Sequence, residues 1–166
     1  TAGDFQQVVA ELGLHRALHH TNRGPEHHGV EFLDHLAAAE RAEVAALADA
    51  GITAYHAVRK AASGLFPGTT AVVQGAGGLG HIGVQTLKAI TSAKVIVVDR
   101  SPAALELAKE IGADETVVSD GSHIDAVKDL TGGRGADVVF DFVAEQGAEL
   151  DGWAMTAPAG YQYIIG

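Results

Sequence analysis

A short apolar run that ends in a cluster of glycines constrains this chain more than any other stretch. Residues Ala71–Gln74 are mostly small or β-branched, as in a buried strand, and Gly75, Gly77 and Gly80 follow them with the spacing G-x-G-x-x-G. Apolar residues then recur at helical spacing over residues 82–90. The stretch therefore predicts a strand, a tight turn and the start of a helix.

Each glycine in this turn is expected to have its own structural role. Gly75 lets the chain turn sharply out of the strand, Gly77 removes a Cβ so that backbone N–H groups can approach a pyrophosphate, and Gly80 lets the helix pack closely on the sheet. A helix starting near Gly78 would place its positive end against the anion. A glycine-rich turn without a ligand has the same spacing, so the motif needs support from the rest of the chain.

That support comes from an acid about twenty residues further on, where dinucleotide-binding folds bind the ribose. The apolar run Lys94–Val98 is followed directly by Asp99, which can accept hydrogen bonds from ribose hydroxyls. Its charge would repel a 2′-phosphate, so the motif indicates NAD rather than NADP, although the neighbouring Arg100 weakens this discrimination.

Composition excludes several classes of protein. With 47% apolar and 19% charged residues among 166, the chain can bury a core and is not wholly disordered. Its net charge of -10 argues against nucleic acid or anionic membranes as partners. Because it has no cysteine, disulfides and thiolate zinc sites are excluded. There is no apolar run of membrane-spanning length and no signal-peptide pattern, so we expect a cytoplasmic protein.

The remaining pattern alternates helices with strands. Helices are expected over residues 43–58, 102–111, 123–131 and 146–155, and strands over residues 115–118, 137–143 and 161–165. With the two strands above, this predicts an α/β fold, a doubly wound parallel Rossmann sheet of order 3-2-1-4-5. A ligand would bind at the carboxyl ends of its strands. On the first of these helices, Leu47, Ile52, Tyr55 and Val58 would line the buried face.

The first forty-two residues form a separate, histidine-rich segment that we expect to be helical, followed by a nucleotide-binding domain over residues 43–166. Six of the nine histidines fall in this segment. His15 and His19 are four residues apart, which would place both on one helical face, as zinc ligands require. No third ligand is fixed beside them by spacing, so solvated surface histidines are the other interpretation.

Several stretches, in order along the chain, resemble the cofactor domain of zinc-dependent alcohol dehydrogenases in the medium-chain dehydrogenase/reductase superfamily. They are Leu47–Val58, Gly75–Gly83, Val97–Asp99 and Asp141–Val143. The resemblance covers about residues 43–166 and nothing before them.

The resemblance implies a role for individual residues of this chain. Backbone N–H groups of Gly77, Gly78 and Leu79 would bind the pyrophosphate, Asp99 the adenosine ribose, and Thr53 would lie against the nicotinamide, with Phe142 and Val143 passing over the cofactor. Asp49 stands where the family places the third protein ligand of its catalytic zinc, and it could equally be an ordinary surface acid.

The same family has parts with no counterpart in this sequence, namely a sixth strand and a catalytic domain whose cysteine and histidine complete the zinc site. We therefore expect the NAD(H)-binding domain of an alcohol dehydrogenase-type oxidoreductase, with zinc doubtful and no activity from this chain alone. A stand-alone nucleotide-binding module and a truncated or engineered scaffold are the alternatives. Residues 161–165 would form an unpaired edge strand without lysine or proline, which predicts a homo-oligomer through that strand unless the N-terminal helices cover it.

Overall fold

The computed structural model describes residues 38–166, and the side chains from residue 50 onward. The predicted N-terminal helices and the histidine pair His15 and His19 lie outside the described residues. Residues 47–166 form one compact unit. Within the described part of the chain, no helix combines the length and the apolar character needed to cross a membrane.

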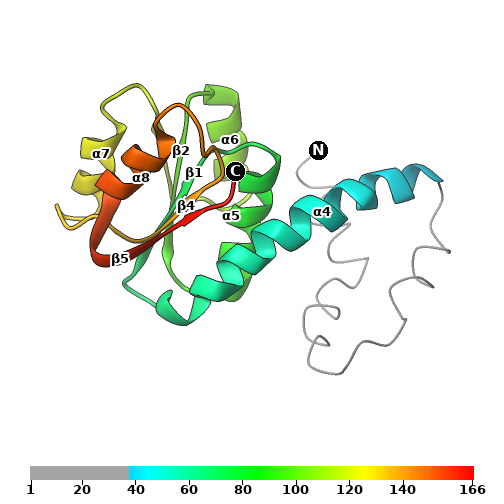
Figure 1. Cartoon of the computed structure of the whole chain (residues 1–166), viewed down its shortest axis with the longest axis horizontal. Helices are drawn as coiled ribbons and strands as arrows, with labels where there is room; N and C mark the ends of the chain where they lie inside the picture. The colour runs from blue at the N-terminus through cyan, green and yellow to red at the C-terminus, as the bar shows by residue number, and fades with distance from the viewer. Residues whose placement is uncertain (1–37) are drawn as a thin grey trace. The chain divides into compact units, whose positions relative to one another are not determined.

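Helices and strands alternate along this unit (Figure 1). In chain order the elements are α4 (Ala38–Ala61), the 3-10 turn η1 (Ala62–Gly64), β1 (Thr70–Gln74), α5 (Gly78–Ile90), β2 (Lys94–Asp99), α6 (Pro102–Glu110), β3 (Glu115–Val118), α7 (His123–Leu130), β4 (Ala136–Asp141), α8 (Ala148–Met155) and β5 (Thr156–Ile164).

The five strands form one sheet of order β3-β2-β1-β4-β5, and every neighbouring pair is parallel, which confirms the predicted topology. Figure 1 shows α7 and α8 on one side of the sheet and α5 and α6 on the other. Every residue of β1 is buried, because helices cover both faces of this central strand. Val72 packs there with Ile96, Val139 and Met155 in a cluster that solvent does not reach.

The helix α4 is longer than predicted and buries a different face. It begins at Ala38 rather than near residue 43 and runs through Gly51 without a break. Val58 is fully buried as expected, but Ile52 is 69% exposed, so its predicted burial is wrong. The buried face consists of Ala54, Ala57, Val58 and Ala61, and at 100° per residue position 52 lies on the opposite side.

The last strand also differs from the prediction, because β5 starts at Thr156 and not at residue 161. The register shifts between Ala136, which pairs with Thr156, and Val138, which pairs with Tyr161. The intervening residues 157–160 therefore bulge out of the ladder. The stretch contains Pro158 and Gly160, and the strand continues through both.

The loop between β4 and α8 is longer than the sequence indicated at both ends. β4 stops at Asp141, whose Oδ1 accepts hydrogen bonds from the N–H groups of Val143 (2.9 Å) and Ala144 (3.0 Å) and so turns the chain. α8 begins at Ala148 rather than at Gln146, because Gln146 has a left-handed φ of 57° that no α-helix contains.

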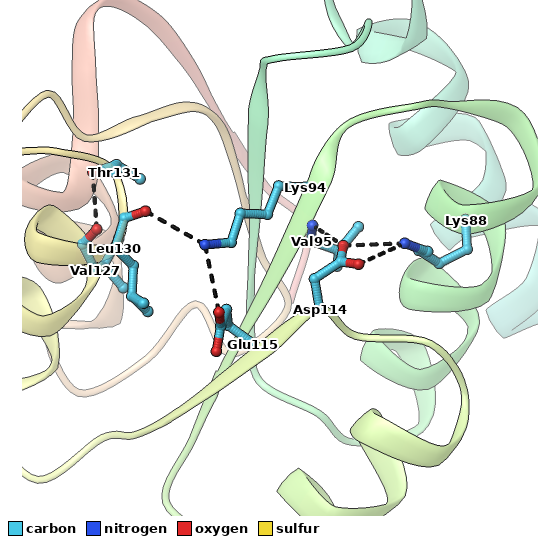
Figure 2. A network of polar contacts seen from close by, with 8 residues as sticks. All are labelled: Lys88, Lys94, Val95, Asp114, Glu115, Val127, Leu130 and Thr131. Carbon is cyan, nitrogen blue, oxygen red and sulfur yellow. Dashed lines mark hydrogen bonds and ion pairs between the residues drawn. The ribbon is translucent and has the colours of Figure 1, made fainter.

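Carboxylates fasten the amino end of the sheet (Figure 2). Asp114 Oδ2 accepts the N–H of Val95, the second residue of β2, at 2.7 Å, and Lys88 Nζ lies 3.0 Å from both of its oxygens. On the other side of β2, Lys94 Nζ lies 3.6 Å from a carboxylate oxygen of Glu115. Burial raises the pKa of Asp114, but the Val95 N–H and the Lys88 ammonium outweigh it, so the pKa lies below its ordinary value.

A second carboxylate does the same for the central strand. Asp137 Oδ2 accepts the N–H of Thr70, the first residue of β1, at 2.7 Å, and its other oxygen lies 2.6 Å from Arg134 Nη1. Arg134 lowers the pKa of Asp137 against the opposing effect of burial, and the Thr70 N–H lowers it further. The inner strands β1 and β2 therefore each donate an N–H near their start to a carboxylate that stays charged at neutral pH.

Candidate functional site

The turn after β1 uses its first glycine for its backbone conformation. Gly75 has a φ of 89°, which side-chain-bearing residues rarely adopt. Its N–H donates to the carbonyl of Val98 at 2.8 Å, which fastens the turn to β2. A Cβ at this position would also lie 2.6 Å from Cγ2 of Val143. The backbone and its surroundings therefore both require glycine here.

The third glycine allows the close packing that the sequence predicted. A Cβ on Gly80 would collide with the carbonyl oxygen of Gly75 and lie 2.9 Å from its carbonyl carbon. The first turn of α5 thus rests directly on the backbone of the glycine turn, so the helix start and the turn form one rigid piece.

The second glycine is different, because the protein itself does not need it. Gly77 is the N-cap of α5 with an ordinary φ of -73°, and a Cβ there would meet nothing within 4 Å. None of the side chains that the structure describes caps this helix. The N–H groups of the first turn, at Gly78 and Leu79, are therefore left for water or a ligand, beside a space that only a larger side chain would fill.

Asp99 lies at the end of β2 and is held beside this turn. Its Oδ2 accepts the N–H of Ala76 at 2.6 Å, and its Oδ1 accepts the N–H of Ser101 at 2.7 Å. The residue is half-buried, and a carboxylate offers about four acceptor sites, so each oxygen can accept one more hydrogen bond. The carboxylate is therefore preoriented for a ligand that carries hydroxyl groups.

A cavity of about 190 Å³ opens beside the turn, at the carboxyl ends of the strands. Four predicted site residues line it, namely Gly75, Asp99, Arg100 and Val143, whereas Thr53, Gly77, Gly78, Leu79, Gly80 and Phe142 are not among its lining residues. The rest of the lining consists of residues that were not predicted, namely Gln74, Val98, Ser119, Glu145, Gln146, Ala148 and Asp151. Gln74 carried a signal, because it is the one polar residue at the end of an apolar strand.

The loop after β4 closes one side of this cavity in a defined conformation. Asp141, which fixes the loop, is fully buried, and Gln146 accepts a hydrogen bond from Arg100 Nη1 at 3.2 Å. Phe142 turns toward α5 instead, where a Cβ on Gly83 would lie 2.8 Å from its ring. Val143 therefore faces the cavity while Phe142 packs the loop onto the helix.

A larger hollow of about 560 Å³ lies at the opposite, amino end of the sheet. Its charged lining residues are Lys88, Lys94 and Asp114, which are already paired with one another or with Glu115. We place the candidate site at the carboxyl ends, where the glycine turn and Asp99 have hydrogen-bonding capacity left for a ligand.

Two further predicted site positions, Thr53 and Asp49, lie on α4. Thr53 is half-buried in the helix, and Asp49 lies one turn earlier, with its side chain outside the described part. Among the side chains that the structure describes, no group of three histidine, cysteine, aspartate or glutamate residues could hold a metal ion. The uncapped N-terminus of α5 and the Asp99 carboxylate together suit a ligand with phosphates next to hydroxyl groups.

Comparison with known proteins matches this chain to dehydrogenases. The family model described as "Zinc-binding dehydrogenase" matches residues 78–166. The NAD-dependent alcohol dehydrogenase of Sulfurisphaera tokodaii is 45% identical over 101 residues, which are 60% of this chain and 28% of the relative. That of Sulfolobus acidocaldarius is 38% identical over 121 residues, covering 72% of this chain and 34% of the relative.

A solved structure agrees with these relatives. The alcohol dehydrogenase of Aeropyrum pernix superposes with a TM-score of 0.76 at 42% identity, over 78% of this chain and 38% of that one. This chain spans about a third of the length of the curated relatives it matches.

Proposed function

The chain belongs to the zinc-binding dehydrogenase family and carries its alcohol dehydrogenase-type NAD-binding domain, and from this membership we propose that residues 43–166 bind NAD(H) in preference to NADP(H). The single observation that supports the proposal is the hydrogen bond from the Ala76 N–H to Asp99, which places a carboxylate able to accept from ribose hydroxyls beside the glycine turn. In this proposal the pyrophosphate lies against the N-terminus of α5, and the adenosine ribose donates to Asp99.

The open space at Gly77 supports the same arrangement. A pyrophosphate needs close approach to backbone N–H groups, and a Cβ on Gly77 would meet no atom of the described residues within 4 Å. The backbone N–H groups of Gly78 and Leu79 would supply the hydrogen bonds, and the positive end of α5 would supply the favourable field. The dinucleotide would continue toward Thr53 with its nicotinamide end.

The wider reaction is a proposal about the complete enzyme. There the nicotinamide would exchange a hydride with an alcohol, and a zinc ion would polarise the alcohol oxygen as a Lewis acid. Asp49 would be one ligand of that ion. Because zinc takes four ligands, one carboxylate does not hold it, and catalysis needs ligands from outside residues 43–166. We therefore expect cofactor binding but no alcohol oxidation from this chain alone.

The test is a titration of the chain with NADH and NADPH, followed by cofactor fluorescence. We expect NADH to bind at least about tenfold more tightly, because Asp99 accepts from the ribose hydroxyls and repels a 2′-phosphate. Asp99→Asn removes the charge but keeps one acceptor for the Ala76 N–H, so the preference should narrow toward about threefold or less. The charge-matched control is Asp129→Asn on the exposed side of α7. Equal affinities in the unmodified protein would refute the role of Asp99.

We also propose that two copies pair through β5. This strand lies at the edge of the sheet, and its side chains Tyr161 and Ile164 are 66% and 58% exposed. An edge strand presents unpaired N–H and C=O groups that a second copy can satisfy. The division into residues 1–42 and 43–166 and a cytoplasmic location stay predictions from the sequence.

A further inference from the structure

The cavity beside Asp99 is too small for a whole dinucleotide. Its volume is about 190 Å³, whereas sites that enclose a complete small-molecule ligand measure roughly 300–1,000 Å³. It therefore suits one part of the cofactor. This inference rests on the proposed binding of NAD(H). In that arrangement, the part of the cofactor next to the ribose at Asp99 is the adenine base.

The cavity offers the base both apolar and polar surface. Val143 contributes apolar surface from the loop after β4, and Asp151 reaches the cavity from α8. Asp151 lies far along the chain from the glycine motif and has no place in it. Its carboxylate is 39% exposed, so a ligand in the cavity can still reach it.

A buried histidine orients this carboxylate. His123, the first residue of α7, is 4% exposed, and its Nε2 lies 3.2 Å from Asp151 Oδ2. Its Nδ1 is buried without a partner among the described residues. A hydrogen on Nδ1 would be a buried donor with no acceptor, so the neutral ring with its hydrogen on Nε2 is favoured. In that form His123 donates to Asp151 and fixes the direction of its carboxylate.

We propose that Asp151, positioned by His123, accepts a hydrogen bond from the amino group of the adenine and selects an aminopurine over a 6-oxopurine. A carboxylate only accepts hydrogen bonds, which matches an amino group. In nicotinamide hypoxanthine dinucleotide a carbonyl oxygen replaces that amino group, and two acceptors then face each other. Because the Asp151 carboxylate and this carbonyl oxygen cannot form a hydrogen bond with each other, the affinity for the hypoxanthine dinucleotide should be lower.

The experiment measures the affinities of NADH, reduced nicotinamide hypoxanthine dinucleotide and NADPH for the full chain. We expect NADH to bind at least about tenfold more tightly than the hypoxanthine analogue. Asp151→Asn places an amide at the cavity, which can donate to the carbonyl oxygen or accept from the amino group. The ratio between the two bases should fall to within about twofold, and the NADH-to-NADPH ratio, which depends on Asp99, should not change.

His123→Phe tests the positioning role separately. A phenyl ring fills the buried site but donates nothing, so the base ratio should fall partway while the NADH-to-NADPH ratio persists. Asp129→Asn, which removes an equal charge from the exposed side of α7, should leave both ratios unchanged. Circular dichroism confirms that each variant is folded.

Two results separate this inference from the proposed function. Equal affinity of the unmodified chain for NADH and its hypoxanthine analogue, or an unchanged ratio in Asp151→Asn, overturns the role of Asp151 and leaves NAD(H) binding intact. Failure of NADH to bind at all overturns both.

Discussion

Gly77 and Gly80 lie three residues apart in one motif, yet the structure predicts opposite consequences for replacing them. In Gly80→Ala the new Cβ would collide with the carbonyl group of Gly75. Because this carbonyl belongs to the backbone, it cannot move aside as the end of a flexible side chain would. Overpacking of this kind costs typically about 1–3 kcal/mol, and here the upper end applies because α5 must shift away from the turn. Alanine regains about 1 kcal/mol as the better helix former. The net loss is about 2 kcal/mol, or roughly 8 °C in Tm for a domain of this size.

Gly77→Val should leave the fold almost unchanged. A Cβ at this position meets no atom within 4 Å, and the φ of -73° suits any residue. Valine is a poorer N-cap than glycine, but it also restricts the unfolded chain, and the two effects leave the stability within about 1 kcal/mol of the parent. The branched side chain would occupy the space assigned to the pyrophosphate, so the affinity for NADH should fall at least about tenfold.

The assay combines thermal unfolding without ligand and NADH titration for each variant. Gly64→Ala is the control, because that glycine lies away from the motif and a Cβ there also meets nothing within 4 Å. It should match the parent in both measurements. A Gly77→Val protein that loses more than about 2 kcal/mol of stability would refute the view that this glycine serves the ligand, since such losses indicate a structural role. A Gly80→Ala protein with unchanged Tm would refute the packing argument.

Three further predictions concern stability and association. Ala159 has a φ of 64°, so Ala159→Gly should stabilise the fold by about 0.5–1 kcal/mol in denaturant titrations, whereas the control Ala154→Gly, inside α8, should destabilise it by about 1 kcal/mol. Asp137 has a lowered pKa, so its contribution to the free energy of unfolding is fully present above the unfolded pKa of about 4 and is lost as the pH falls through the folded pKa. The difference in unfolding free energy between the parent and Asp137→Asn should therefore shrink on acidification below a pH of about 4. A difference that stays constant down to about pH 2 would contradict this. Ile164→Lys places a charge on the exposed side of β5, so it should shift any dimer seen by sedimentation toward monomer, and a parent that is monomeric at high micromolar concentration would rule out pairing through this edge.

The topology could be predicted from the sequence because its signals are local. Apolar runs, glycine turns and caps such as Ser101, whose Oγ accepts the N–H of Ala104 at 3.3 Å, mark each element where it occurs. Strand order then follows from the right-handed crossover rule. The errors arose where tertiary packing decided the outcome, as at Ile52, whose helix buries alanines instead, and at β5, which continues through a proline and a glycine.

Only the part of the candidate site that follows from one short stretch of sequence could be predicted. The glycine turn and Asp99 belong to a known spacing, and the structure brings them together through Ala76. The partnership of His123 with Asp151 spans 28 residues and three elements, and no periodicity connects them. The carboxylates that fasten the amino end of the sheet were missed for the same reason, since Asp114 and Asp137 look like ordinary surface acids in the sequence.

The carboxylates of Asp137 and Asp114 allow two backbone amides to report on the opening of the sheet at its amino end. The N–H groups of Thr70 and Val95 donate to Asp137 and Asp114 instead of to a neighbouring strand. Their nuclear magnetic resonance frequencies should therefore follow the titration of each carboxylate while the rest of the sheet is still folded. Their hydrogen exchange with solvent should also be faster than that of residues deeper in β1 and β2, because rotation of a single side chain exposes each amide. A spectrum recorded during acidification would thus separate the release of each strand end from global unfolding.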